Sequence, residues 1–132
     1  MMTLRNARFI VVLLGVLLPY AARLPRGMGW LRQYTDMSPG GWLFFAAFNA
    51  IAWGALLAVS LVYRRPASLI APCLLGFGFL ALAHATLDLR ADAQAAIALV
   101  FIPIYALIPI AIGGAIGYAL DRRLPMENAE RR

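Results

Sequence analysis

The stretch WLFFAAFNAIAWGALLAVSLVY, residues 42–63, contains no charged side chain over 22 positions. An α-helix rises about 1.5 Å per residue, and roughly 20 apolar residues cross the hydrocarbon core of a bilayer. Just ahead of the stretch, Ser38 is a suitable N-cap and Pro39 a suitable first helical residue. The stretch therefore predicts a membrane-spanning helix.

Three more apolar segments approach or meet the same length, at residues 9–24, 66–89 and 93–120. Only residues 64–65 and 90–92 separate the last three spans, and such short connections join neighbouring helices that run in opposite directions. We therefore expect an all-α integral membrane protein with a single domain, in which four transmembrane helices form a sequential antiparallel bundle.

The predicted outer loop, residues 25–41, and the predicted cytoplasmic tail, residues 121–132, lie outside the spans. Within the loop, MGWLRQYTDM (residues 28–37) places Trp30 and Tyr34 four residues apart, which fits either a short helix in the membrane interface or a structured loop. The first span also has the basic start and apolar centre of a signal peptide. The polar region expected before a cleavage site is missing, which favours an uncleaved span.

The composition excludes an ordinary soluble domain. Hydrophobic residues make up 63% of the 132 residues and charged residues only 14%, against about 25% charged in typical soluble domains. The net charge of +6 comes from arginines at the ends of apolar runs, a pattern typical of topology signals and headgroup contacts. We expect the lipid bilayer as a partner and no nucleic acid.

The arginines also predict the orientation. Arginine without lysine, together with abundant alanine, glycine and proline, indicates a GC-rich bacterial genome, and hence the bacterial inner membrane. With both termini in the cytoplasm, eight arginines lie inside and four outside, which the positive-inside rule favours. Three arginines of the first loop oppose the rule, and a first segment that does not cross the membrane would remove this conflict. The inside group is Arg5, Arg8, Arg64, Arg65, Arg122, Arg123, Arg131 and Arg132, and the outside group is Arg23, Arg26, Arg32 and Arg90.

The last span carries two features that affect helix packing. Pro103 and Pro109 each remove a backbone donor, which predicts a kink or a loosened turn; transporters use such breaks as binding sites, but ordinary membrane helices contain them too. Gly113 and Gly117 form a GxxxG pair on a face shared with Ala106 and Pro109. This face predicts close helix packing, either within the bundle or between protomers.

The same span supports a resemblance. AQAAIALVFIPIYALIPIAIGGAIGYALDRR, residues 93–123, resembles the last helix of small, uncharacterised multispanning bacterial inner-membrane proteins, over about the last quarter of the chain. The resemblance brings no catalytic or ligand-binding residues with it. Small multidrug exporters are similar in size, but they carry an acid within the first helix, and residues 9–24 contain none.

Four polar residues form a candidate ligand or proton site on the outer side: Tyr20, Asn49, His84 and Asp88. His84 would titrate near neutral pH, Asp88 would orient it one helical turn away, and Asn49 and Tyr20 would bind a ligand. A purely structural alternative gives Asn49 a hydrogen bond between helices and His84 a backbone or water partner. It also pairs Asp88 with Arg90 and uses Asp92 as the N-cap of the last helix.

No enzyme motif accompanies these residues, and one histidine with two nearby acids does not make a metal site. We expect no enzymatic activity, no cofactor and no metal. The leading hypothesis is a small non-enzymatic inner-membrane protein that acts through helix packing as an accessory subunit or a small homo-oligomer. The alternative is a small transporter or channel with an outer-side polar site.

Overall fold

A computed structural model describes residues 1–123, and over that range the chain is all-helical, as the sequence predicts. Residues 124–132, which include most of the predicted tail with Arg131 and Arg132, lie outside the described residues. The helices are α1 (Leu4–Ala21), α2 (Met28–Thr35), α3 (Pro39–Ser60), α4 (Ile70–Thr86) and α5 (Ala98–Arg123), with short 3-10 turns η1 (Leu24–Arg26), η2 (Pro66–Leu69) and η3 (Ala95–Ile97).

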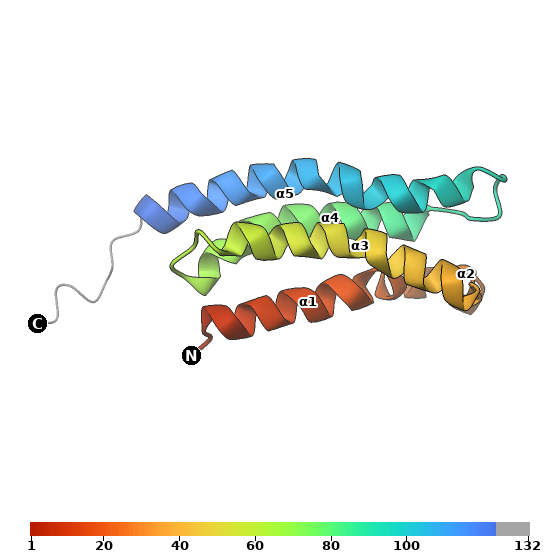
Figure 1. Cartoon of the computed structure of the whole chain (residues 1–132), viewed down its shortest axis with the longest axis horizontal. Coiled ribbons are helices and arrows are strands. Elements are labelled where there is room, and N and C mark those ends of the chain that lie inside the picture. Colours follow the sequence, from red (N-terminus) through yellow and green to blue (C-terminus); the bar gives the residue numbers. More distant parts are fainter. Residues whose placement is uncertain (124–132) are drawn as a thin grey trace, which may run out of the picture.

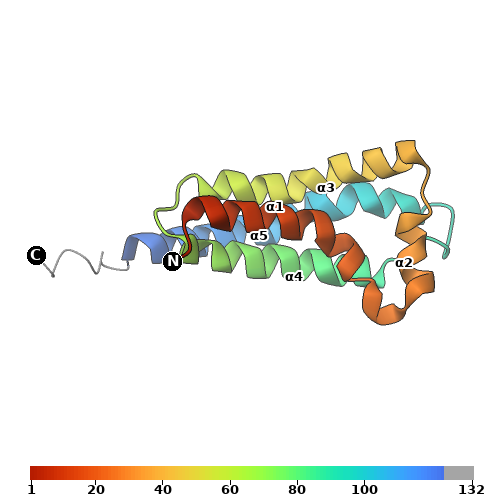
Figure 2. The same ribbon diagram turned by 90° about the horizontal axis from the view of Figure 1, so that it is seen from below.

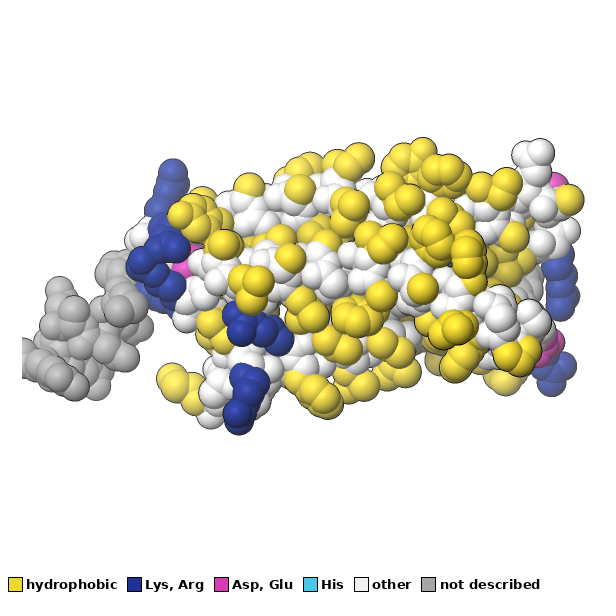
Figure 3. Space-filling model, viewed as in Figure 1, with side chains coloured by type: hydrophobic (Ala, Val, Ile, Leu, Met, Phe, Trp, Pro, Cys, Tyr) yellow, Lys and Arg dark blue, Asp and Glu magenta, His cyan; other side chains and the backbone are white. Residues whose placement is uncertain are grey.

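Four stretches are long and apolar enough to cross a membrane: Leu4–Arg26, Pro39–Ser60, Pro66–Thr86 and Ala95–Arg123. On the face shown in Figure 3, hydrophobic side chains lie along the length of the bundle, whereas arginines gather near its two ends. One end holds α2 and is called the α2 end. The opposite end holds the start of α1, the η2 turn and the end of α5, and is called the Asp121 end (Figure 1).

The four long helices follow one another around the bundle in the order α1, α3, α5, α4 (Figure 2). Helix α5 packs extensively against α4 and α3, and α1 packs against both α3 and α4. Helices α3 and α4 touch little, although the sequence predicts direct neighbours. The reason is that the connection includes Leu61 and the η2 turn besides the two arginines, which is enough chain to cross the Asp121 end.

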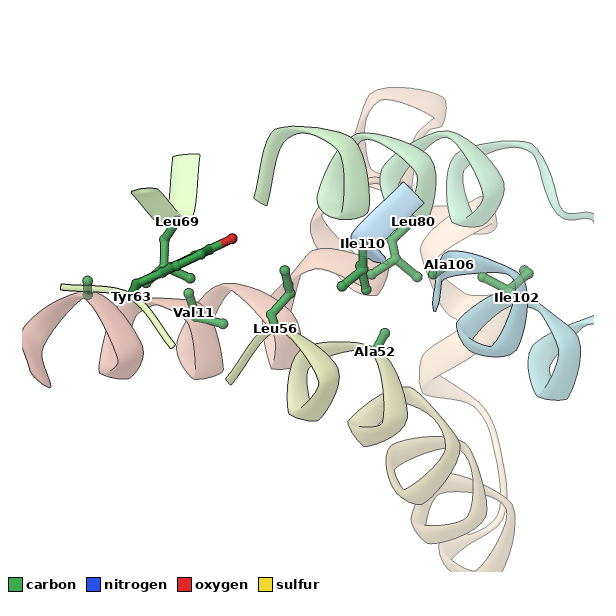
Figure 4. Packing of buried hydrophobic residues seen from close by; sticks show 10 residues of the cluster. Val11, Ala52, Leu56, Tyr63, Leu69, Leu80, Ile102, Ala106 and Ile110 are labelled. Atoms are coloured by element: carbon green, nitrogen blue, oxygen red, sulfur yellow. The ribbon is translucent and has the colours of Figure 1, made fainter. Parts of the chain in front are cut away.

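Narrow stripes of small and apolar residues make the core. In α1 every fourth residue from Ala7 to Pro19 is buried, and in α4 every fourth residue from Pro72 to His84. Such i, i+4 stripes bury one face of a helix and leave the remaining faces to the lipid. In the middle of the bundle, Leu80 of the α4 stripe belongs to one buried cluster with Leu56 of α3 and Ile110 of α5 (Figure 4).

Several helix ends differ from the predicted ones. Ser38 Oγ accepts a hydrogen bond from Gly41 N at 3.1 Å, which confirms the predicted N-cap of α3. Helix α4 ends at Thr86, so its last turn contains His84. The prediction that Asp92 caps the last helix is wrong: Asp92 Oδ1 accepts from Gln94 N at 2.7 Å in a local turn, and α5 begins only at Ala98.

Helix α5 is continuous through Pro103 and Pro109. Gly113 lies against the start of α4, where an added Cβ would come within 2.5 Å of Pro72 Cα and 2.8 Å of Ala71 O. Gly117 lies equally close to Ser68 O and to the Tyr63 hydroxyl group. The predicted packing face, on which Ala106 is also buried and Pro109 half-buried, is therefore turned into the bundle.

Replacing Gly113 with alanine should destabilise the bundle by about 1–3 kcal/mol, because the methyl group meets backbone atoms that cannot rotate away. Gly78→Ala is the matched control, since nothing lies within 4 Å of an added Cβ at that position. Thermal or denaturant unfolding in mild detergent measures both. Equal stability of the two variants would contradict the close approach of α5 and α4.

Candidate functional site

Arg23 lies at the centre of a buried polar cluster at the α2 end and has no exposed surface. It follows Pro19 by four residues and so extends the buried stripe of α1 beyond the helix end. Its guanidinium group donates four hydrogen bonds of 2.7 to 2.9 Å. The acceptors are Trp30 O, His84 O, Leu87 O and the side-chain oxygen of Gln33.

These contacts cap the C-terminal end of α4. The last carbonyls of a helix lack intrahelical partners and carry a partial negative charge, which a cation complements. Arg23 covers the His84 and Leu87 carbonyls, and Trp30 Nε1 donates to the Ala85 carbonyl at 3.0 Å. Two side chains from outside α4 thus complete its final turn.

Aromatic rings enclose the guanidinium group. Its carbon lies 3.9 Å from the centre of the Tyr34 ring and 4.8 Å from that of Trp30, both within the range of cation–π attraction. Tyr34 is fully buried, and its hydroxyl group lies 2.8 Å from His84 Nδ1. Burial raises the pKa of the Tyr34 phenol, while the charge of Arg23 acts in the opposite direction. The phenol is therefore neutral at physiological pH.

Gln33 joins this cluster to Asp88. Its side-chain oxygen accepts from Arg23 and from Leu89 N, and its Nε2 donates to Asp88 Oδ1 at 3.1 Å. Asp88 thus interacts with the positive charge through an amide rather than by direct contact. This arrangement ties α2 and the chain after α4 to the end of α1.

The structure separates the four predicted site residues. His84 hydrogen-bonds Tyr34 rather than Asp88, because α4 ends between them and the i, i+4 relation no longer applies. Asp88 Oδ1 accepts from the backbone N of Arg90 at 3.0 Å, in place of the predicted side-chain pair. Tyr20 and Asn49 line a groove between α1 and α3, to which His84 does not contribute.

Asn49 has a specific structural partner. Pro19 has no N–H group, so the carbonyl of Gly15, one turn earlier, loses its intrahelical donor. Asn49 Nδ2 donates to this carbonyl at 2.8 Å, across the contact between α3 and α1. In a membrane, a backbone carbonyl without a hydrogen-bond donor costs several kcal/mol. The bond to Gly15 therefore gives the Nδ2 group of Asn49 a structural role. Its oxygen, Oδ1, has no partner among the described residues.

A second polar cluster lies at the Asp121 end. Asp121 is buried and accepts from Arg64 N, Arg65 N and Ser68 Oγ, just ahead of α4. Nearby, the Tyr63 hydroxyl group donates to the Gly114 carbonyl at 2.8 Å. Arg8 donates to Ser60 through Nε and a terminal nitrogen, which joins α1 to the end of α3.

Sequence reasoning missed Arg23, Gln33, Trp30 and Tyr34 as members of one cluster. Two signals pointed to Arg23: it conflicts with the positive-inside rule, and it continues the four-residue stripe that runs through Gly15 and Pro19. No comparable signal marks Gln33, because its neighbours come from a distant segment.

The hydrogen bonds of these two clusters join segments that lie far apart in the sequence. Most of the polar groups described above are paired with backbone or with one another, the exceptions being Asn49 Oδ1 and His84 Nε2. No group of three or more metal-ligating side chains occurs within residues 1–123. Comparison with protein-family models, curated proteins and solved structures gives no match.

Replacing Arg23 with leucine should destabilise the protein by about 2–4 kcal/mol, because the α4 carbonyls lose their donors without access to water. Arg23→Lys should fall between leucine and the parent, since lysine lacks the planar fork. Arg26→Leu is the control, because Arg26 is exposed. Unfolding in detergent that matches for Arg23→Leu and Arg26→Leu would disprove the capping role.

Tyr34 should ionise only as the protein unfolds. Its pKa is higher in the folded than in the unfolded chain, so the stabilising effect is complete below about pH 10 and disappears as pH rises further. In an ultraviolet titration, Tyr34→Phe should reduce the late phenolate step that accompanies loss of helical circular dichroism. A late step of unchanged amplitude would show that Tyr34 is accessible in the folded protein.

Proposed function

We propose that the chain is a bacterial inner-membrane protein whose four long helices cross the bilayer in alternating directions, with both termini in the cytoplasm. The Asp121 end, with its many arginines, would face the cytoplasm. Arg23 lies on the outer side in this orientation, which opposes the positive-inside rule. Its charge is buried inside the protein rather than placed in the headgroup region, so it opposes the orientation less than the sequence indicates.

We infer that its function is non-enzymatic and depends on helix packing, as an accessory subunit or a small oligomer. One observation carries this proposal: His84 and Asn49 are buried in contacts between segments, and the groove that Asn49 lines does not include His84. A transport site would need both residues on a common, water-accessible surface.

Helix α5 offers a surface for such packing. Its GxxxG face is occupied by α4 and Tyr63, but Ala111, Ala115 and Ala119 repeat every fourth residue on an exposed face. Small residues at this spacing allow the backbones of two membrane helices to approach closely. A second copy of the chain or another membrane protein would pack there.

The alternative, a small transporter or channel, receives less support. The core between the two polar clusters is apolar, with Leu56, Leu80 and Ile110 in one buried cluster. A conduction path would require these side chains to separate and the Arg23 hydrogen bonds to break. This alternative therefore requires a second, open conformation of the protein.

Replacing Ala115 with leucine should lower self-association or partner capture several-fold, because the larger side chain holds the helices apart. Crosslinking in native membranes, followed by mild-detergent purification, measures both forms of association. Gly78→Leu adds even more bulk on an exposed position of α4 and should leave association at the parent level. Parent-like association of both variants would disprove packing through α5.

A further inference from the structure

Helices α1 and α3 touch near the middle of the bundle and separate toward the α2 end. At Gly15 an added Cβ would lie 2.4 Å from Trp53 Cβ, so the two helices are in contact there. Beyond this point the ribbons separate toward α2 (Figure 2). Between them lies a groove of about 180 Å³. Its lining includes Tyr20, Trp42, Phe45, Ala46, Asn49 and Trp53.

The residues that line this groove are mostly aromatic, and one of them, Asn49, has an unpaired polar atom just beneath the surface of the groove. Asn49 is only 5% exposed, and its Nδ2 is held by the Gly15 carbonyl, which fixes the direction of the amide. Its Oδ1 accepts no hydrogen bond from the described residues. A buried acceptor without a partner costs about 1–3 kcal/mol, so a ligand that supplies a donor would recover part of this energy.

We propose that the groove binds a neutral, membrane-dissolved lipid that has one apolar chain and a hydroxyl group, with the hydroxyl donating to Asn49 Oδ1. The ligand class follows from the walls: aromatic side chains suit hydrocarbon, and an amide oxygen suits an O–H donor. A carboxylate would place its own lone pairs against this oxygen. This proposal goes beyond helix packing and does not depend on it.

The size of the groove limits how much of the lipid enters. Sites that enclose a whole small molecule measure roughly 300–1,000 Å³. A groove of about 180 Å³ therefore holds only the hydroxyl end and the adjoining carbons, while the rest of the chain lies in the bilayer. Because Asn49 Oδ1 is covered, the hydroxyl reaches it by moving a lining side chain, which lowers the affinity.

Tryptophan quenching tests the proposal, because Trp42 and Trp53 line the groove. The full-length protein is placed in phosphatidylcholine nanodiscs and titrated with a chain-brominated dodecanol, its methyl ether and the corresponding fatty acid. The alcohol should quench at a roughly fivefold lower membrane concentration than the ether, as expected for one hydrogen bond of about 1 kcal/mol. The fatty acid should also be weaker than the alcohol.

Two substitutions localise the effect. Ala46→Phe fills the groove and should reduce quenching by the alcohol to the level of the ether or below, whereas Ala47→Phe, on the neighbouring exposed position, should not. Asn49→Leu should abolish the preference for the alcohol. If Asn49→Leu does not fold, the Ala46 and Ala47 pair decides the matter.

Three outcomes would overturn the proposal. Equal quenching by alcohol and ether in the parent would show that Asn49 Oδ1 receives no donor. Unchanged quenching in Ala46→Phe would place the lipid elsewhere. Stronger quenching by the fatty acid would assign the groove to an anionic lipid.

Discussion

The pairing of backbone groups at the two ends of α4 is the constraint on which the bundle depends. Water cannot satisfy an unpaired N–H or C=O within hydrocarbon, and each such group costs several kcal/mol. At the C-terminal end of α4 the donor is Arg23, from the end of α1. Ahead of its N-terminal end the acceptor is Asp121, from the last turn of α5. The positive charge of Arg23 has the sign that the dipole of α4 favours at its C-terminal end.

The same principle explains polar residues at greater depth. Asn49 serves the Gly15 carbonyl that Pro19 leaves without a donor, and Tyr63 donates to the Gly114 carbonyl. These bonds join helices that belong to distant parts of the sequence. Polar residues in a membrane helix are functional candidates by default, but Asn49 and Tyr63 each have a backbone partner that gives them a structural role. Only Asn49 Oδ1 and His84 Nε2 are buried without a partner among the described residues.

The sequence was informative about properties that depend on position along a helix. Apolar length predicted the all-helical class and the four long segments, and Ser38 predicted the start of α3 because N-cap chemistry is local. The sequence did not predict how each helix is rotated about its own axis, or which distant segments contact one another. The end of α4 at Thr86 has no glycine or proline to mark it, so Asp88 was placed on the same helical face as His84. The true partner of His84, Tyr34, comes from α2, whose docking on Arg23 depends on tertiary contacts alone.

Side-chain size along one interface explains why the bundle is closed in its middle but hollowed near the α2 end. Helices α1 and α3 approach closely at Gly15, which has no side chain to keep them apart. Five residues further along α1, the ring of Tyr20 meets Trp42 and Phe45 with centroids 6.3 and 6.0 Å away. Three large rings cannot fit within the spacing that a glycine permits, so the helices must separate there. The groove is therefore a consequence of the residues that line it, and the Asn49 amide, held by the Gly15 carbonyl, leaves its oxygen for the donor that we propose.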